Sequence, residues 1–204
     1  MSVDIPGPLQ FALDQAEESL AASPDGELAL PYRRRIWDAL GEGTEGHESR
    51  GHRRRTALDL LTVERVQPIW DQTYPDDPSV AEVIDAARQV LDGRQSADWA
   101  DGLQGRMWAS FLNRMNADHQ FPAGYVGAAA TAALSTAGHD KRYSTVPPDA
   151  DDDDLDPEDW DTSFMAAMAS AGGEVGDPGA STERRRDFWE WYLREAVPRA
   201  WRAA

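Results

Sequence analysis

The C-terminal run from Arg184 to Trp201 constrains this chain most, because it carries three of the eight tryptophans. Wound into a helix of 3.6 residues per turn, it places most of its large apolar side chains on one wide face. That face comprises Phe188, Trp189, Tyr192, Leu193, Ala196 and Ala200, with Trp191 on its flank. An apolar arc this wide is not a surface stripe, so the sequence predicts a buried core helix.

Two residues of this helix stand out. The helical wheel places Glu195 within the aromatic arc, where an ionised carboxylate needs an arginine or a backbone N–H as partner. The preferred interpretation is that Glu195 forms a structural ion pair, and the alternative is that it is a catalytic or ligand-binding acid. Pro198 lacks an N–H and disfavours helix at Val197, so we expect a kink or stop there.

Other segments of the chain also show helical periodicity. Their apolar spacing, N-cap residues and helix-ending glycines predict an all-α, single-domain bundle of about seven to eight helices over residues 1–204. No alternating strand pattern or internal repeat appears. Residues 41–52 and 143–156 are expected to be mobile loops, and the N-terminal helix is expected within residues 1–26. The remaining predicted helices span approximately residues 32–40, 53–70, 80–91, 96–115, 122–137 and 157–171.

Composition narrows the class of function. The chain has no cysteine, no basic-then-apolar leader and no run of eighteen apolar residues, which predicts a soluble, cytoplasmic protein. Its formal net charge of −17 argues against direct nucleic-acid or anionic-membrane binding. Residues 149–161 hold nine acids and no base, so they supply −9 of that −17.

Candidate chemistry is sparse in the sequence. The four histidines show no metal-ligand spacing, and there is no nucleophile motif. The acidic run is not a calcium loop, because Asp154 stands where a glycine is needed and Trp160 where a bidentate glutamate is needed. We therefore predict no catalytic residue, no metal and no cofactor.

Three stretches together resemble a known family. They are Pro31-Tyr-Arg-Arg-Arg-Ile-Trp-Asp-Ala-Leu40, Val66-Gln-Pro-Ile-Trp-Asp71 followed by Tyr74-Pro-Asp-Asp, and Arg185-Arg-Asp-Phe-Trp-Glu-Trp-Tyr-Leu-Arg-Glu-Ala-Val-Pro198. The chain resembles the fifth numbered family of immunity proteins from bacterial polymorphic toxin systems. The resemblance implies a mainly helical cytoplasmic protein, encoded beside a toxin, that neutralises the toxin by binding and has no catalysis of its own. The matching residues, expected mostly in the core, are Trp37, Pro68, Trp70, Trp189, Trp191, Tyr192, Leu193 and Glu195.

The sequence supports two hypotheses of function. The first is an inhibitor whose acidic face covers the basic site of a cognate toxin, a nuclease being one class that fits. The second is an enzyme or small-ligand binder that uses Glu195 in a Trp-lined pocket; the absence of a nucleophile or metal set favours the first. We expect the partner-facing residues in the acidic run, with a disordered solubilising loop as the alternative. They are Asp151, Asp152, Asp153, Asp154, Asp156, Glu158 and Asp159.

Overall fold

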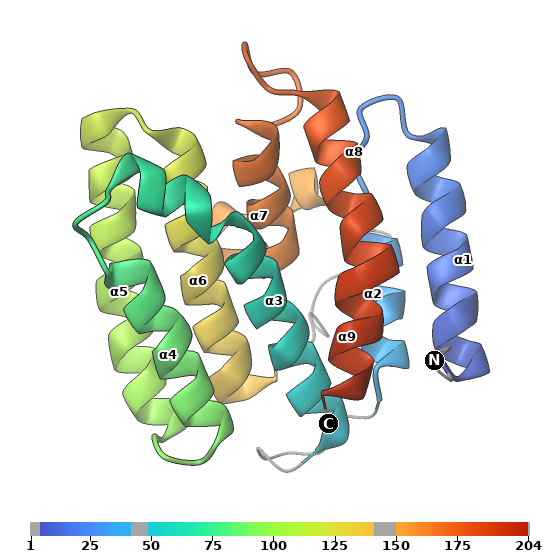
Figure 1. The fold of residues 1–204 in the computed structure, drawn as a ribbon, viewed down its shortest axis with the longest axis horizontal. Helices are drawn as coiled ribbons and strands as arrows, with labels where there is room; N and C mark the ends of the chain where they lie inside the picture. Colours follow the sequence, from blue (N-terminus) through green and yellow to red (C-terminus); the bar gives the residue numbers. More distant parts are fainter. Residues whose placement is uncertain (1–4, 42–48, 141–149, 204) are drawn as a thin grey trace.

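The computed structural model describes residues 5–41, 49–140 and 150–203. Within these ranges the regular elements are all helical, which confirms the predicted all-α class. Because α8, η3 and α9 follow one another without a break, the described residues form eight helical rods and two short 3-10 turns (Figure 1). The elements are α1 (Gly7–Ala22), α2 (Leu30–Ala39), α3 (Arg50–Thr73), α4 (Ser79–Leu91), α5 (Ala97–Asp118), α6 (Phe121–His139), η1 (Asp152–Asp154), η2 (Pro157–Asp159), α7 (Thr162–Ala171), α8 (Thr182–Trp191), η3 (Tyr192–Ala196) and α9 (Val197–Arg202).

Helix α6 is the centre of one half of the bundle. It packs against α3, α4, α5 and α7, and its small residues are what allow four neighbours to approach. A Cβ added at Gly124 or Gly127 would lie only 2.5 Å from the side chains of Met115 and Phe111, respectively. The helix predicted over residues 122–137 is confirmed.

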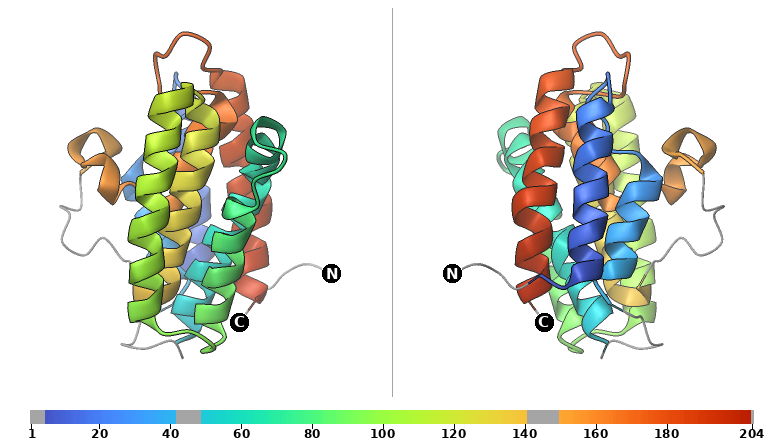
Figure 2. Two further views of the ribbon diagram at one scale, coloured as in Figure 1. Left: turned by 90° about the vertical axis from the view of Figure 1, so that its left-hand side faces the viewer. Right: turned by 90° about the vertical axis from the view of Figure 1, so that its right-hand side faces the viewer.

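The C-terminal rod is the centre of the other half. It lies between α1 on one side and α3 and α7 on the other (Figures 1 and 2). Phe188, Trp189, Tyr192 and Leu193 are each at most 2% exposed, which confirms the predicted buried aromatic helix. Their rings contact one another edge to face, Trp189 to Phe188 at 5.1 Å and Trp189 to Tyr192 at 5.4 Å between centroids.

One π-helical turn, η3, interrupts this rod just before Pro198. The N–H of Val197 donates to the carbonyl of Tyr192, five residues back. A π turn holds one more residue than an α turn and rotates the next residues of the chain around the helix axis. The predicted break at Val197 is therefore replaced by a bulge, after which the chain continues as α9.

Helix α3 also contains a proline and continues past it. Pro68 is exposed, and the helix runs on to Thr73, three residues beyond the predicted end, with the bend near its C-terminal end visible in Figure 1.

At the N-terminal end of α3, Ser49 caps the helix by accepting from the N–H of His52 at 3.0 Å. The helix thus begins at Arg50, inside the stretch predicted as a loop. Of the two predicted mobile loops, residues 42–48 and 143–149 lie outside the described residues.

Two helix starts differ from the predicted ones. Helix α4 begins at Ser79, one residue before its predicted start, and the Asp77 carboxylate accepts from the N–H of Ser79 at 2.9 Å. For α7 the cap is Asp161, which accepts from the N–H groups of Ser163 and Phe164. The predicted start, at residue 157, therefore lies in the short turn η2, which Asp156 precedes. None of the helices in the described ranges has the length and apolar character to cross a membrane.

Candidate partner-binding surface

A fully buried arginine anchors the acidic segment to the bundle. Arg33, on α2, donates through Nη1 to Asp152 Oδ2 at 2.9 Å and through Nη2 to Asp161 Oδ2 at 2.6 Å. It also donates to the carbonyl of Leu28 at 2.6 Å. The Arg33 side chain is 0% exposed and each of the two carboxylate side chains is 6% exposed, so this is an interior ion cluster.

Aromatic rings enclose the same guanidinium. Its central carbon lies 5.4 Å from the ring centroid of Phe164 and 5.4 Å from that of Trp189. Cation–π contacts of this kind gain strength when water is excluded. The aromatic C-terminal helix therefore helps to hold the arginine that binds the acidic segment.

A second arginine extends the cluster. Arg185 is 2% exposed, and its Nε lies 3.5 Å from Glu27 Oε2. Burial raises the pKa of Glu27 to about 7, against the opposing effects of Arg33 and Arg185. Burial also raises the pKa of Asp152 to about 6, although Arg33 acts in the opposite direction. Burial tends to lower the pKa of Arg33, but Asp161 and Asp152 outweigh it and hold that pKa well above its usual range.

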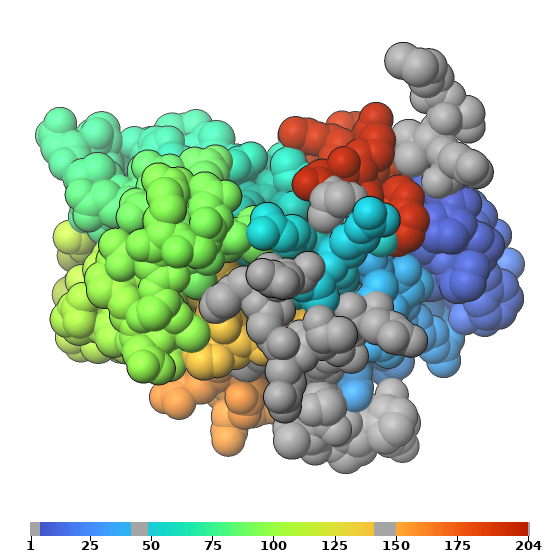
Figure 3. Space-filling view, turned by 90° about the horizontal axis from the view of Figure 1, so that it is seen from below, coloured from blue at the N-terminus to red at the C-terminus, as the bar shows by residue number. Residues whose placement is uncertain are grey.

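The acidic segment itself, residues 150–161, is folded. A reciprocal capping box joins Asp151 and Asp154, with the N–H of Asp151 donating to Asp154 Oδ2 at 2.9 Å. Further along, the indole N–H of Trp160 donates back to the carbonyl of Asp152 at 3.1 Å. Figure 2 shows the segment standing out from the helices, and in Figure 3 it reaches the surface at the edge of the molecule, beside α5 and α6.

Six of the seven predicted partner-facing residues are exposed on this segment. Asp152 is the exception, because it is 4% exposed and bound to Arg33. Asp152 and Asp161 thus help to hold the segment on the bundle, and Asp152 does not face outward as predicted. The local pattern could not reveal this, since Arg33 lies 119 and 128 residues away in sequence. The exposed residues are Asp151, Asp153, Asp154, Asp156, Glu158 and Asp159.

The expected position of Glu195 is also wrong. The residue is exposed, whereas its neighbours Ala196 and Val197 are fully buried. The wheel assumed a regular α-helix, and the π turn changes the angular register of the residues within it. Glu195 therefore lies outside the aromatic arc, and the hypothesis that it works inside a Trp-lined pocket has no support from its position. Of the other family-matching residues, Trp37, Trp70, Trp189, Tyr192 and Leu193 are buried, Trp191 is partly buried, and Pro68 is exposed.

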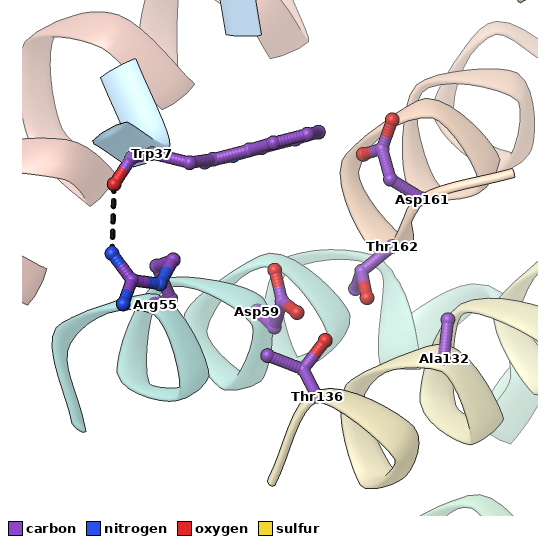
Figure 4. Close-up of a pocket in the computed structure, with 7 residues that line it drawn as sticks. All are labelled: Trp37, Arg55, Asp59, Ala132, Thr136, Asp161 and Thr162. Atoms are coloured by element: carbon purple, nitrogen blue, oxygen red, sulfur yellow. Dashed lines mark hydrogen bonds between the residues drawn. The ribbon is translucent and has the colours of Figure 1, made fainter. Parts of the chain in front are cut away.

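A small cavity lies beneath the acidic segment (Figure 4). Its volume is about 20 Å³, which is room for one water molecule and not for a substrate. Burial raises the pKa of Asp59, in its wall, to about 7. Arg55 closes one side by donating to the carbonyl of Trp37 at 2.9 Å. The cavity is lined by Trp37, Arg55, Asp59, Ala132, Thr136, Asp161 and Thr162.

The described residues contain no group of three or more histidine or carboxylate side chains arranged to hold a metal ion.

Sequence reasoning missed Arg33 and Asp161 as organising residues. A signal for Asp161 was present, because Asp161-Thr-Ser ahead of the apolar run from Phe164 is an N-cap pattern. No local signal distinguished Arg33 from Arg34 and Arg35 beside it.

Comparison with known proteins agrees with the fold and the motifs. The comparison with curated proteins returned no match. A family model described as immunity protein Imm5 matches residues 13–199, which is nearly the whole chain and includes α2, α3, the acidic segment and the C-terminal rod. The chain therefore belongs to the Imm5 family of immunity proteins, which act in toxin systems.

Proposed function

We propose that this protein neutralises a cognate toxin in the cytoplasm by binding it one to one, without catalysis. Family membership supports the class of function. The observation that carries the mode of binding is the anchored acidic segment, which displays six exposed carboxylates on a folded support. The interior beneath it offers a cavity for a single water, which does not favour turnover of a substrate.

Anchoring makes the carboxylates better suited to binding than a mobile loop would be. A loop that orders on binding loses conformational entropy at that moment, and a segment that is already ordered does not. Here Arg33 fixes Asp152, and Trp160 closes the segment on itself. The backbone that carries the exposed carboxylates is thus ordered before a partner binds.

The charge favours a basic partner surface, and a nuclease has one. A toxin that handles RNA or DNA presents lysine and arginine to phosphates, and a row of carboxylates is complementary to such a site. The chain's net charge of −17 adds long-range attraction. We propose that the exposed acids cover the basic site of the toxin.

The test uses the C-terminal domain of the toxin encoded beside this chain, in a catalytically inactive form. One variant combines Asp153→Asn, Asp156→Asn and Glu158→Gln, which leaves the Asp151–Asp154 capping box intact. The matched control removes the same charge at exposed acids on α1, α3 and α8. It combines Glu18→Gln, Asp71→Asn and Asp187→Asn.

We expect wild type to form a one-to-one complex. The acidic-segment variant should associate about tenfold more slowly at low salt, with a shallower salt dependence, because rim charges act mainly on the association rate. The control should change the rate by less than about threefold. Absence of a complex with wild type would refute toxin binding, and equal rates for the two variants would refute the role of the acidic segment.

A further inference from the structure

A groove opens directly beside the acidic segment. Its volume is about 660 Å³, and its walls come from α5, α6, α7, the η2 turn and the loop after α7. The side of η2 that carries exposed acids therefore also forms one bank of the groove. The lining residues are Trp108, Leu112, Met115, Asn116, Phe121, Tyr125, Ala128, Asp156, Pro157, Glu158, Trp160, Met165 and Glu174.

The groove is apolar in its interior. Tyr125, Ala128 and Met165 are buried and form its floor, whereas Trp108 and Leu112 are partly exposed on the α5 side. At the lip, Phe121 is 44% exposed, although it is one of the largest apolar side chains in the chain. Methionines line the groove at two places, and their flexible thioethers adapt to the shape of what they contact.

Close packing of α5 on α6 fixes this floor. Met115 lies over Gly124, where an added Cβ would come within 2.5 Å of its Cγ. Gly124 therefore lets Met115 turn into the space between the helices and line the groove. The packing of α5 on α6 thus shapes this wall of the groove without a partner.

The rim of the groove is acidic. Asp156 and Glu158 are exposed on the η2 bank, and Glu174, in the loop after α7, is also exposed and lines the groove. Glu174 accepts a hydrogen bond from the Tyr125 hydroxyl at 2.7 Å, which fixes its carboxylate at the edge. The described residues that line the groove include no lysine or arginine. The negative charge of the rim is therefore not neutralised within the groove.

Taking the proposed function as its basis, we propose that this groove receives an apolar side chain of the cognate toxin that is flanked by lysine or arginine. The apolar interior fits an aromatic or aliphatic anchor, and the three carboxylates fit the basic residues beside it. Small-ligand sites place their polar groups inside the pocket to orient the ligand. Here the carboxylates lie at the rim and the one hydroxyl of the floor is already bonded, which favours a protein partner.

This arrangement is that of a binding hot spot. Anchors in apolar pockets, surrounded by a polar rim that excludes water, carry most of the energy of protein interfaces. The groove would supply affinity and the neighbouring acidic segment would supply speed of association. Changes in the groove should therefore act mainly on the dissociation rate, and changes in the acidic segment mainly on the association rate.

The experiment compares two double variants of the full chain against the inactive toxin domain. Phe121→Ala with Glu158→Lys removes the lip and reverses one rim charge. The control, Phe11→Ala with Glu18→Lys, makes the same chemical changes on α1, at the other end of the bundle from α5 in Figure 1, where Phe11 is 64% exposed. Thermal unfolding of each variant checks that the fold is kept, and Glu158→Lys alone serves if Phe121→Ala does not fold.

We expect the groove variant to bind at least about 30-fold more weakly than wild type, chiefly through faster dissociation, and the control to differ by less than about threefold. If wild type binds and both variants bind equally well, the groove assignment is wrong while the proposed function stands. If wild type does not bind, both fail. If the free protein forms a dimer and the Phe121→Ala variant does not, a second copy of the chain occupies the groove. That result would also overturn the assignment.

Discussion

Replacing Arg33 with methionine tests the ion cluster that supports the acidic segment. The change keeps the length of the side chain and removes the guanidinium, leaving Asp152 and Asp161 buried without their cation. Both carboxylates are only 6% exposed, so water does not replace the lost partner. Breaking a buried pair in this way costs about 3 to 5 kcal/mol, a large part of a typical domain's stability.

The loss should depend on pH with a definite sign. Burial already raises the pKa of Asp152 to about 6 with Arg33 present, and removal of the cation raises it further. A carboxyl whose folded pKa lies above its unfolded pKa loses stability as pH rises between the two values. The variant should therefore be most destabilised near pH 8 and should approach wild type as the pH falls to 5.

The assay is urea unfolding at several pH values, with Arg35→Met as the control. Arg35 lies on the same helix but is exposed, so its loss should cost less than about 1 kcal/mol. Adding Asp152→Asn and Asp161→Asn to Arg33→Met should recover much of the stability, because the buried negative charges are then gone. A loss below about 1 kcal/mol at pH 8, or a loss that does not change with pH, would refute this account of the cluster.

Two further predictions concern the interior. Trp189→Ala removes a fully buried ring that contacts Phe188, Tyr192 and Arg33. It should lower the free energy of unfolding by about 3 to 5 kcal/mol. An unchanged midpoint of thermal unfolding would contradict the packing described for the C-terminal rod. Burial raises the pKa of Asp59 to about 7 from an unfolded value near 4, so its ionised form disfavours the fold above pH 7. In denaturant unfolding, Asp59→Asn should therefore stabilise the protein at pH 8 by up to about 4 kcal/mol and have little effect at pH 4. Equal effects at the two pH values would contradict a raised pKa for Asp59.

The sequence predicted the helices well because each has its own apolar period and its own start or stop signal. The fourth helix, for example, was predicted to its last residue, Leu91, from the spacing of Val80, Val83, Ala87 and Val90. Helix starts were less exact where a residue other than the expected one made the cap, as Asp161 does for α7. Periodicity is a property of neighbouring residues, so it locates elements and not the contacts between them.

The site was harder to predict for the same reason. The acidic run was visible in the composition, but the division between buried Asp152 and its exposed neighbours depends on Arg33, far away in the chain. The groove could not be anticipated, because each of its apolar residues reads as ordinary core on its own helix. Glu195 was misplaced because a helical wheel assumes constant angular steps, and the π turn before Pro198 breaks that assumption.

The long sequence separation within the ion cluster has a consequence for folding. Asp161 lies 128 residues after Arg33, and at typical rates of synthesis of about 5 to 20 residues per second it is made about 6 to 26 s later. Until Asp152 and Asp161 have been made, the Arg33 guanidinium lacks the two carboxylates that it binds in the folded protein, and these distant segments of the chain must meet before the cluster closes. Formation of the acidic surface thus requires most of the chain to have been made, and a nascent chain that ends before Asp161 would not carry the complete cluster. Contacts of this span also slow folding, which makes the segment a late element in the order of assembly.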